Sequence, residues 1–222
     1  MSLPPGQSPP VDDGGSALTA FQVEVAKLFF ALPASEGFLL AGGAALAAQH
    51  LTSRPTQDLD FFTAPGRGDV TNARDEFEHA VRTRGWQVER IRDTATFCRL
   101  LVRGPHELLI DLAMDSTPGL PATASLAGPT FAPEELAARK VLALFGRAEA
   151  RDFADLYELA RVYNVTTLIT RAADLDAGFD LDVFASMLGT LTRFTDDDIP
   201  AVTDVADLRA FFASWAADLR NR

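Results

Sequence analysis

The sequence of 222 residues contains one cysteine (Cys98), three histidines and two lysines. A single cysteine cannot form an internal disulfide, which excludes the small disulfide-stabilised scaffolds of secreted proteins. The histidines are far apart, and no Cys-x-x-Cys or His-x-x-x-His pair occurs, so we expect no zinc site. A chain of this length can bury a large core without such crosslinks.

Positive charge is also scarce. Lys and Arg total 20 against 31 Asp and Glu, a formal net charge of -11. This balance argues against wrapping duplex DNA or coating an anionic membrane. The exception is residues 74–103, where seven arginines stand against five acidic residues. If the protein binds RNA, only this stretch and the surroundings of Lys140 supply a basic track.

Membrane and targeting patterns are missing as well. No Lys or Arg precedes Lys27, so a secretory signal would have no basic segment. The longest uncharged run, between Glu36 and Arg54, contains Gly42, Gly43 and several polar residues, which suits a strand, turn and helix better than a membrane span. We therefore expect a cytoplasmic location. The phosphate-binding, dinucleotide-binding and nucleophile-elbow glycine motifs are also missing.

The apolar pattern predicts an α+β half followed by an all-helical half. Residues 1–16, rich in Pro, Gly, Ser and Asp, are predicted to be a disordered lead-in. The α+β core is predicted over 17–116, a linker loop with four prolines over 117–133, and a helical domain over 134–222. The expected strands span residues 37–41, 59–62, 86–91, 96–102 and 107–114. The expected helices span residues 17–32, 44–50, 69–84, 134–145, 152–163, 181–191 and 205–220.

Two carboxylates follow a glycine turn. Gly42 and Gly43 end a short apolar strand and begin a helix, where glycines let a phosphate approach the backbone and free N–H groups attract an anion. Asp58 and Asp60 lie two apart on the next strand, so they project from the same face. Neighbouring carboxylates repel each other and persist where a cation neutralises them. Mg²⁺ with bound phosphates is the natural partner.

A third carboxylate would complete a two-metal site. Asp111 lies within the apolar strand of residues 107–114, and Asp115 lies on the same face four residues later. A charge in an apolar strand needs a reason, which favours Asp111, with Asp115 as the alternative.

A cationic segment completes the pattern. Lys140, Arg147 and Arg151 return near the same side of a continuous helix, and three cations there could grip a triphosphate. Gly146 interrupts the segment, in which case two helices converge instead. Arg147 and Arg151 could alternatively pair with Glu149, Asp152 and Asp155 as an exposed helix pattern.

These three segments together resemble the AbiEii/AbiGii toxin family of nucleotidyltransferases. The family pattern is Gly-Gly-(Ala/Thr)-Ala-Leu, then Arg-x-(Ser/Thr)-x-Asp-(Leu/Ile)-Asp, and later a Lys with an Arg seven residues on and an Arg-Asp-x-x-Asp-Leu run. The matching residues are Gly42, Gly43, Ala44, Ala45 and Leu46, then Arg54, Thr56, Asp58 and Asp60, and then Lys140, Arg147, Arg151, Asp152 and Asp155. The match covers residues 38–163.

The resemblance implies a nucleotidyltransferase fold, with a mixed sheet flanked by helices. It also implies an NTP substrate, Mg²⁺ as cofactor (two ions, with Mn²⁺ as an alternative), and transfer of a nucleoside monophosphate. For characterised relatives it implies the acceptor end of tRNA as target and a neighbouring antitoxin as partner. The implied metal ligands are Asp58, Asp60 and Asp111, which with Asp155 form the catalytic set. The implied nucleotide-binding residues are Gly42, Gly43, Arg54, Thr56, Lys140, Arg147 and Arg151.

Several roles stay open at this stage. Arg54 could position phosphate or brace the aspartates, and Asp155 could be catalytic or could orient Arg151. The acceptor could also be a protein or a small aminoglycoside-like molecule, because residues 152–222 hold 13 acidic against six basic residues and would attract a cation. A third hypothesis is a non-catalytic partner-binding protein on the same scaffold.

Overall fold

The computed structural model describes residues 17–200 and 204–221. The lead-in predicted over residues 1–16 lies outside the described residues, and the division into domains stays a prediction. Within the described ranges, no helix combines the length and the apolar composition needed to cross a membrane.

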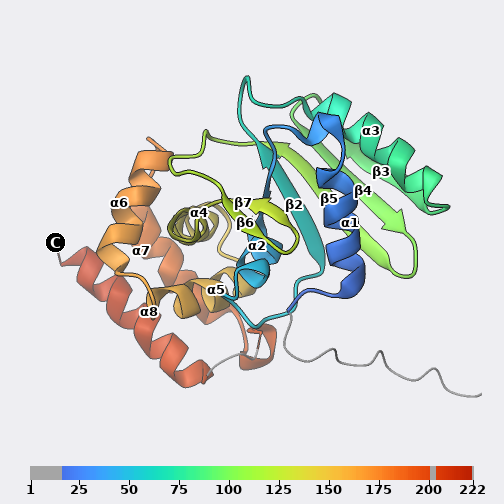
Figure 1. Ribbon diagram of the computed structural model, residues 1–222. Coiled ribbons are helices and arrows are strands. Elements are labelled where there is room, and N and C mark those ends of the chain that lie inside the picture. The colour runs from blue at the N-terminus through green and yellow to red at the C-terminus, as the bar shows by residue number, and fades with distance from the viewer. Residues whose placement is uncertain (1–16, 201–203, 222) are drawn as a thin grey trace, which may run out of the picture.

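A seven-stranded mixed sheet forms the centre of the N-terminal part (Figure 1). Its strand order is β3-β4-β5-β2-β1-β7-β6. The pairs β2–β5 and β1–β7 are parallel and the others antiparallel. The strands are β1 (Leu39–Ala41), β2 (Asp58–Thr63), β3 (Gln87–Asp93), β4 (Phe97–Arg103), β5 (Glu107–Met114), β6 (Thr123–Ser125) and β7 (Gly128–Thr130). The predicted mixed sheet and helical C-terminal part are confirmed.

Two strands of the sheet lie where the sequence predicted only a loop. The hairpin of β6 and β7 lies within residues 117–133, and β7 pairs in parallel with β1 through Thr130 and Leu40. Each strand has three residues, too few for an alternating pattern to show, and the prolines and glycines around them are typical of a loop. The segment therefore extends the sheet.

Two helices cover one face of the sheet, α1 (Ala20–Phe30) and α3 (Val70–Thr83) (Figure 1). Phe29 of α1 stacks on Phe61 of β2 with ring centroids 4.2 Å apart and meets Phe77 of α3 edge-on at 5.7 Å. Because strand side chains alternate, Phe61 faces these helices and Asp58 and Asp60 face the opposite side.

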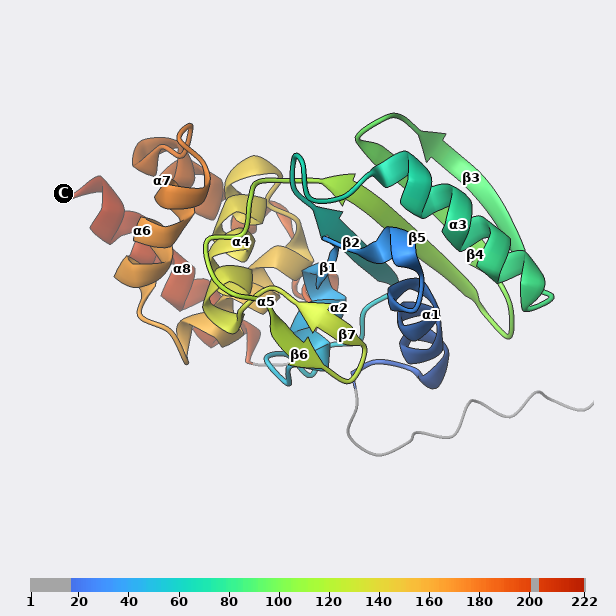
Figure 2. The ribbon, with the colours of Figure 1, turned by 45° about the horizontal axis from the view of Figure 1, so that its top comes forward.

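The helices of the C-terminal part begin beside that opposite side. Figure 2 shows α2 (Gly42–Ala48), α4 (Pro133–Gly146) and α5 (Ala150–Ala160) next to β1 and β2, with α3 on the far side of the sheet. The helical conformation is interrupted between α4 and α5, where Ala148 has a positive φ of 49°. The cationic segment therefore forms two converging helices, not one continuous helix.

Three further helices complete the C-terminal part: α6 (Val165–Leu175), α7 (Leu181–Gly189) and α8 (Val205–Arg220). The sequence prediction missed α6. Asn164 caps it by accepting hydrogen bonds from the N–H groups of Thr166 and Thr167. Phe212 of α8 contacts Phe153 of α5, and Trp215 of α8 contacts Phe184 of α7. Leu168, Ile169 and Ala172 of α6 are buried in the same apolar core.

Candidate active site

The two carboxylates of β2 lie beside a third on β5. Asp60 and Asp111 are directly opposite each other in the parallel pairing of β2 and β5, and Asp58 is opposite Leu109. All three residues face the side of the sheet that α1 and α3 leave open. The pairing brings Asp111 next to the two β2 aspartates, although it lies more than fifty residues after them in the sequence.

The glycine pair allows this cluster to form. Gly42 has a φ of +60°, and a Cβ atom there would lie 1.8 Å from Oδ2 of Asp60. A Cβ at Gly43 would lie 2.9 Å from Oγ1 of Thr56, the hydroxyl that donates to Asp58 Oδ1 at 2.9 Å. The glycines thus make room for the side chains of the carboxylate cluster, a reason the sequence did not reveal.

A cavity of about 50 Å³ gathers the cluster and the cationic segment. It is lined by eleven residues, ten of which belong to the predicted site. They are Gly42, Gly43, Arg54, Thr56, Asp58, Asp60, Asp111, Lys140, Arg147 and Arg151, and the eleventh is Arg99. The structure therefore brings together every predicted site residue except Asp155.

Asp155 lies behind the cavity, with a fully buried carboxylate. Its Oδ2 atom is 2.8 Å from Lys140 Nζ and 2.9 Å from Arg54 Nη2, and its Oδ1 atom accepts from Arg54 Nε at 3.0 Å. Asp155 therefore orients Lys140 and Arg54, whereas the sequence suggested Arg151 as its partner.

The cations also pair with other acids. Asp152, fully buried, accepts two hydrogen bonds from Arg147, at 2.9 and 3.1 Å, and one from Lys140 at 3.3 Å. These charges and hydrogen bonds lower the pKa of Asp152 despite its burial. Arg151 lies 3.3 Å from Asp58 and 2.8 Å from Glu149. Of the pairs that the sequence left as an exposed helix pattern, Arg147 with Asp152 is thus partly buried beside the cavity, whereas Arg151 with Glu149 is exposed.

Sequence reasoning missed Arg99. Its Nε and Nη2 atoms donate to the two oxygens of Asp111 at 2.7 and 2.6 Å, a bidentate pair. The hairpin predicted from the sequence could have revealed this pair. Arg103 and Glu107 flank its turn, and the residues four positions farther along each strand are Arg99 and Asp111, which lie opposite each other.

Asp60 is the group in the cluster without a partner. It has no hydrogen bond or ion pair with any other described residue. Burial, followed by the charges of Asp58 and Asp111, raises the pKa of Asp60 to about 7, although Lys140 and Arg151 oppose this. Of the three aspartates, Asp60 is therefore the one that no close cation among the described residues pairs with, since Asp58 pairs with Arg151 and Asp111 with Arg99.

The donor set fits a hard cation but is not preassembled. Aspartate oxygens are the ligands that Mg²⁺ and Mn²⁺ prefer, and the unpartnered Asp60 is the natural centre of such a site. Yet among residues 17–200 and 204–221, no three acidic, His or Cys side chains are close enough together to enclose an ion. Arg99 holds Asp111, so a cation bound by all three aspartates requires that pair to open.

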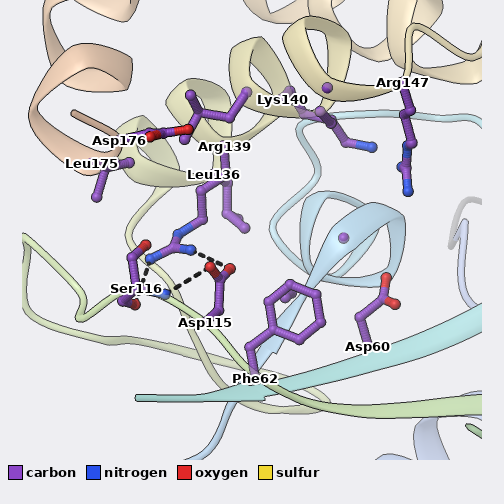
Figure 3. Close-up of a pocket in the computed structure, with 15 residues that line it drawn as sticks. Asp60, Phe62, Asp115, Ser116, Leu136, Arg139, Lys140, Arg147, Leu175 and Asp176 are labelled. Atoms are coloured by element: carbon purple, nitrogen blue, oxygen red, sulfur yellow. Dashed lines mark hydrogen bonds and ion pairs between the residues drawn. The ribbon is translucent and has the colours of Figure 1, made fainter. Parts of the chain in front are cut away.

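A larger cavity of about 560 Å³ adjoins the first and shares Gly42, Asp60, Lys140 and Arg147 with it. Figure 3 shows Asp60 on one wall with Lys140 and Arg147 above it, and Asp115 on another part of the wall. Asp115 pairs with Arg139 at 2.6 Å. The alternative third carboxylate therefore lies in the larger cavity, held by its own cation, while Asp111 lies with Asp58 and Asp60.

The comparison with known families decides the identity of the fold and its chemistry. The family described as "Nucleotidyl transferase AbiEii toxin, Type IV TA system" matches residues 27–221. The chain belongs to the AbiEii nucleotidyltransferase toxin family. The resemblance found in the sequence is confirmed. As a member of the AbiEii family the chain is a nucleotidyltransferase with an NTP substrate, and the family's toxin–antitoxin system implies an antitoxin partner.

Solved structures show that this chain shares its fold with proteins of low sequence identity. JHP933 from Helicobacter pylori is 19% identical over 92% of this chain and 94% of that chain, with a TM-score of 0.56. A putative nucleotidyltransferase from H. pylori is 18% identical over 92% and 96%, with a TM-score of 0.58. MenT4, a nucleotidyltransferase toxin from Mycobacterium tuberculosis, is 16% identical over 93% and 88%, with a TM-score of 0.54. A comparison with curated proteins found no match.

Proposed function

We propose that this nucleotidyltransferase transfers a nucleoside monophosphate from an NTP to a terminal hydroxyl of an RNA, with tRNA as the expected acceptor. The observation that supports the reaction type is the row of Asp60 and Asp111 on paired strands, with Asp58 beside them, facing Lys140, Arg147 and Arg151 across one cavity. Acids and cations so placed suit a phosphate chain with bound divalent ions.

Asp58, Asp60 and Asp111 would hold the divalent ions, with Mg²⁺ expected. Bound there, such ions would lower the pKa of an acceptor hydroxyl and neutralise charge on the phosphates. Asp60 adjoins both other acids, since it is two residues from Asp58 and opposite Asp111, and it has no partner in the described part of the chain, so it would be the main ligand. Thr56 orients Asp58 through its 2.9 Å hydrogen bond.

The cations come from two helices and meet the phosphates from the opposite side. Lys140 and Arg147 border both cavities, so the triphosphate would lie along their shared rim, with the nucleoside in the larger one. Arg151, paired with Asp58 at only 3.3 Å, can turn to a leaving phosphate. Asp155, itself held by Arg54, orients Lys140 from behind the cavity.

The direct test supplies each labelled NTP in turn to the purified chain with Mg²⁺ and total bacterial RNA. We expect label to enter a tRNA-sized band with one or more NTPs, and this incorporation to stop when EDTA removes the metal. Labelled RNA without added divalent ion would overturn the metal assignment. Label that enters no RNA would overturn the RNA acceptor.

One observation keeps a small cationic acceptor as the second candidate. Residues 152–222 hold 13 acidic against six basic residues, and this negative charge would attract an amine-bearing molecule. Transfer to an aminoglycoside in the same assay, with RNA unlabelled, would favour this candidate. The salt dependence separates them too, because an RNA acceptor releases several counterions on binding and its use falls steeply as salt rises.

The third carboxylate can be identified by a matched pair of variants. We expect Asp111→Asn to lower kcat by roughly a hundred-fold or more, since it removes one charged ligand of the cluster. We expect Asp115→Asn to retain most activity, because Arg139 already holds that carboxylate. Steady-state kinetics with saturating NTP measure both. Equal losses in the two variants would contradict the assignment.

A further inference from the structure

A row of four charged residues crosses the sheet away from the cavity. Asp60 is opposite Asp111, Asp111 is opposite Arg99, and Arg99 is opposite Arg92 in the pairings of β2, β5, β4 and β3. The row runs from two acids to two cations on one face of the sheet, the face opposite α1 and α3. Adjacent strands are roughly 4.8 Å apart, so Arg92 lies about 10 Å from Asp111 along this face.

An aromatic ring lies against both cations. Phe97 is two residues before Arg99 on β4 and is half-buried. The guanidinium carbons of Arg92 and Arg99 lie 5.2 and 5.8 Å from the Phe97 ring centroid, within the range of a cation–π contact. The side chain of Arg99 is 44% exposed, and Arg92 is exposed. Arg92, Phe97 and Arg99 are together called the β3–β4 platform below.

The platform concentrates the positive charge of the basic stretch over 74–103. Arg74, Arg82 and Arg90 pair with acids of α3 and β3, on the other face of the sheet. Arg84 and Arg103 pair with Glu24 and with Glu89 and Glu107. Arg92 has no acidic partner among the described residues. Arg99 pairs with one acidic residue among them, Asp111 of the carboxylate cluster.

We propose that the β3–β4 platform binds the single-stranded end of the RNA acceptor, with a base stacked on Phe97 and backbone phosphates at Arg92 and Arg99. This inference rests on the RNA acceptor proposed above. Single-stranded RNA is bound by aromatic rings and guanidinium planes together with local positive charge. The net charge of -11 disfavours a long duplex contact, and a patch of two cations suits one or two nucleotides.

The position of the platform fits the geometry of the reaction. The reacting hydroxyl at the RNA end must reach the aspartate cluster, so the nucleotides that precede this hydroxyl must lie beside the cluster. Arg99 bridges the two places, because it holds Asp111 and borders the cavity while facing Phe97. A phosphate bound by Arg99 would release Asp111, so acceptor binding would help free the third carboxylate.

The test measures binding of a fluorescent single-stranded oligoribonucleotide to the full chain by anisotropy, without NTP or metal. Phe97→Leu is expected to weaken binding roughly 5- to 150-fold, the range for loss of one stacked base, with little change in salt dependence. Phe97→Tyr should restore it. Arg92→Gln should reduce the salt slope by about 0.7, the value for one phosphate on a single strand. Arg193→Gln, an exposed arginine of the helical part, is the matched control and should change neither.

The outcomes separate this inference from the proposed function. If the wild type labels RNA and binds the oligonucleotide, but Phe97→Leu and Arg92→Gln bind it as tightly, the platform is wrong and the RNA acceptor stands. If the wild type neither binds nor labels RNA, both the platform and the RNA acceptor are wrong. Nucleotide binding by each variant, measured separately, should equal that of the wild type, which shows that the fold and the cavity are intact.

Discussion

Changing Asp60 to asparagine is expected to abolish nucleotidyl transfer while leaving the fold intact. Asp60 is the central and unpartnered carboxylate of the cluster, so its loss would remove the main ligand for the proposed divalent ions. Losing several kcal/mol of metal-dependent transition-state stabilisation lowers kcat by roughly a thousand-fold or more. Incorporation of labelled nucleotide into RNA measures the loss.

The stability of the Asp60→Asn variant provides an independent check. The ionised carboxylate is unfavourable in the metal-free protein, because burial and the charges of Asp58 and Asp111 raise the pKa of Asp60 to about 7. A neutral amide removes this repulsion, so at pH 8 the variant should melt at a temperature no lower than the wild type. Asp218→Asn, on the exposed side of α8, is the control and should alter neither activity nor Tm. Wild-type transfer by Asp60→Asn would end the proposed mechanism.

The carboxylate pair was predictable because it depends only on local geometry. Alternation along a strand places Asp58 and Asp60 on one face wherever that strand lies in the sheet. The position of Asp111 beside them was harder to predict, because the spacing of residues in the sequence does not give the order of the strands in the sheet. Its apolar neighbours indicated an unusual charge, and the parallel pairing of β5 with β2 then placed it opposite Asp60.

The pairing of the cations was not predictable in the same way. Lys140, Arg54 and Asp155 come from three separate segments, and their contact depends on how α4 and α5 pack against the β1–β2 connection. A sequence pattern shows which charges are available but not which of them meet. Arg99 is an intermediate case, because the hairpin register gives its partner once the turn is located.

The short elements were missed for a physical reason. A strand of three residues, such as β6 or β7, gains its stability from the neighbouring strand and shows too few residues for periodicity. Helix α6 is a different case, because it has 11 residues and its apolar positions at Leu168, Ile169 and Ala172 and its capping Asn164 are visible in the sequence. It could therefore have been predicted. Long strands and helices with a buried face were predicted because their patterns extend over several turns or alternations.

The largest stability effect is expected at Asp155, which holds two cations in the interior. Its side chain is fully buried, and those of Arg54 and Lys140 are 11% and 8% exposed. In Asp155→Ala, both cations lose a close anionic partner, while Lys140 keeps only the longer contact to Asp152 at 3.3 Å. Breaking a buried pair by removing one partner costs about 3–5 kcal/mol.

In a chain of this length that loss lowers Tm by roughly 6–20 °C. Thermal unfolding followed by circular dichroism measures it. Glu149→Ala serves as the matched control, because it removes a carboxylate that pairs with Arg151 at the half-exposed rim of the same helix pair, and exposed pairs contribute about 1 kcal/mol or less. Equal Tm values for Asp155→Ala and wild type would show that these cations do not depend on Asp155.

A second substitution distinguishes a lost attraction from an uncompensated charge. Arg54 has its acidic partner in Asp155 and its other hydrogen bond to the Pro55 carbonyl. If the cost in Asp155→Ala arises from the stranded guanidinium, then Arg54→Met combined with Asp155→Leu should be more stable than Asp155→Ala, because two apolar side chains replace the pair. The double variant still lacks the contact that orients Lys140. We therefore expect it to recover much of the Tm while its KM for NTP stays raised, which would assign the Arg54–Asp155 pair a role in binding separable from its contribution to the fold.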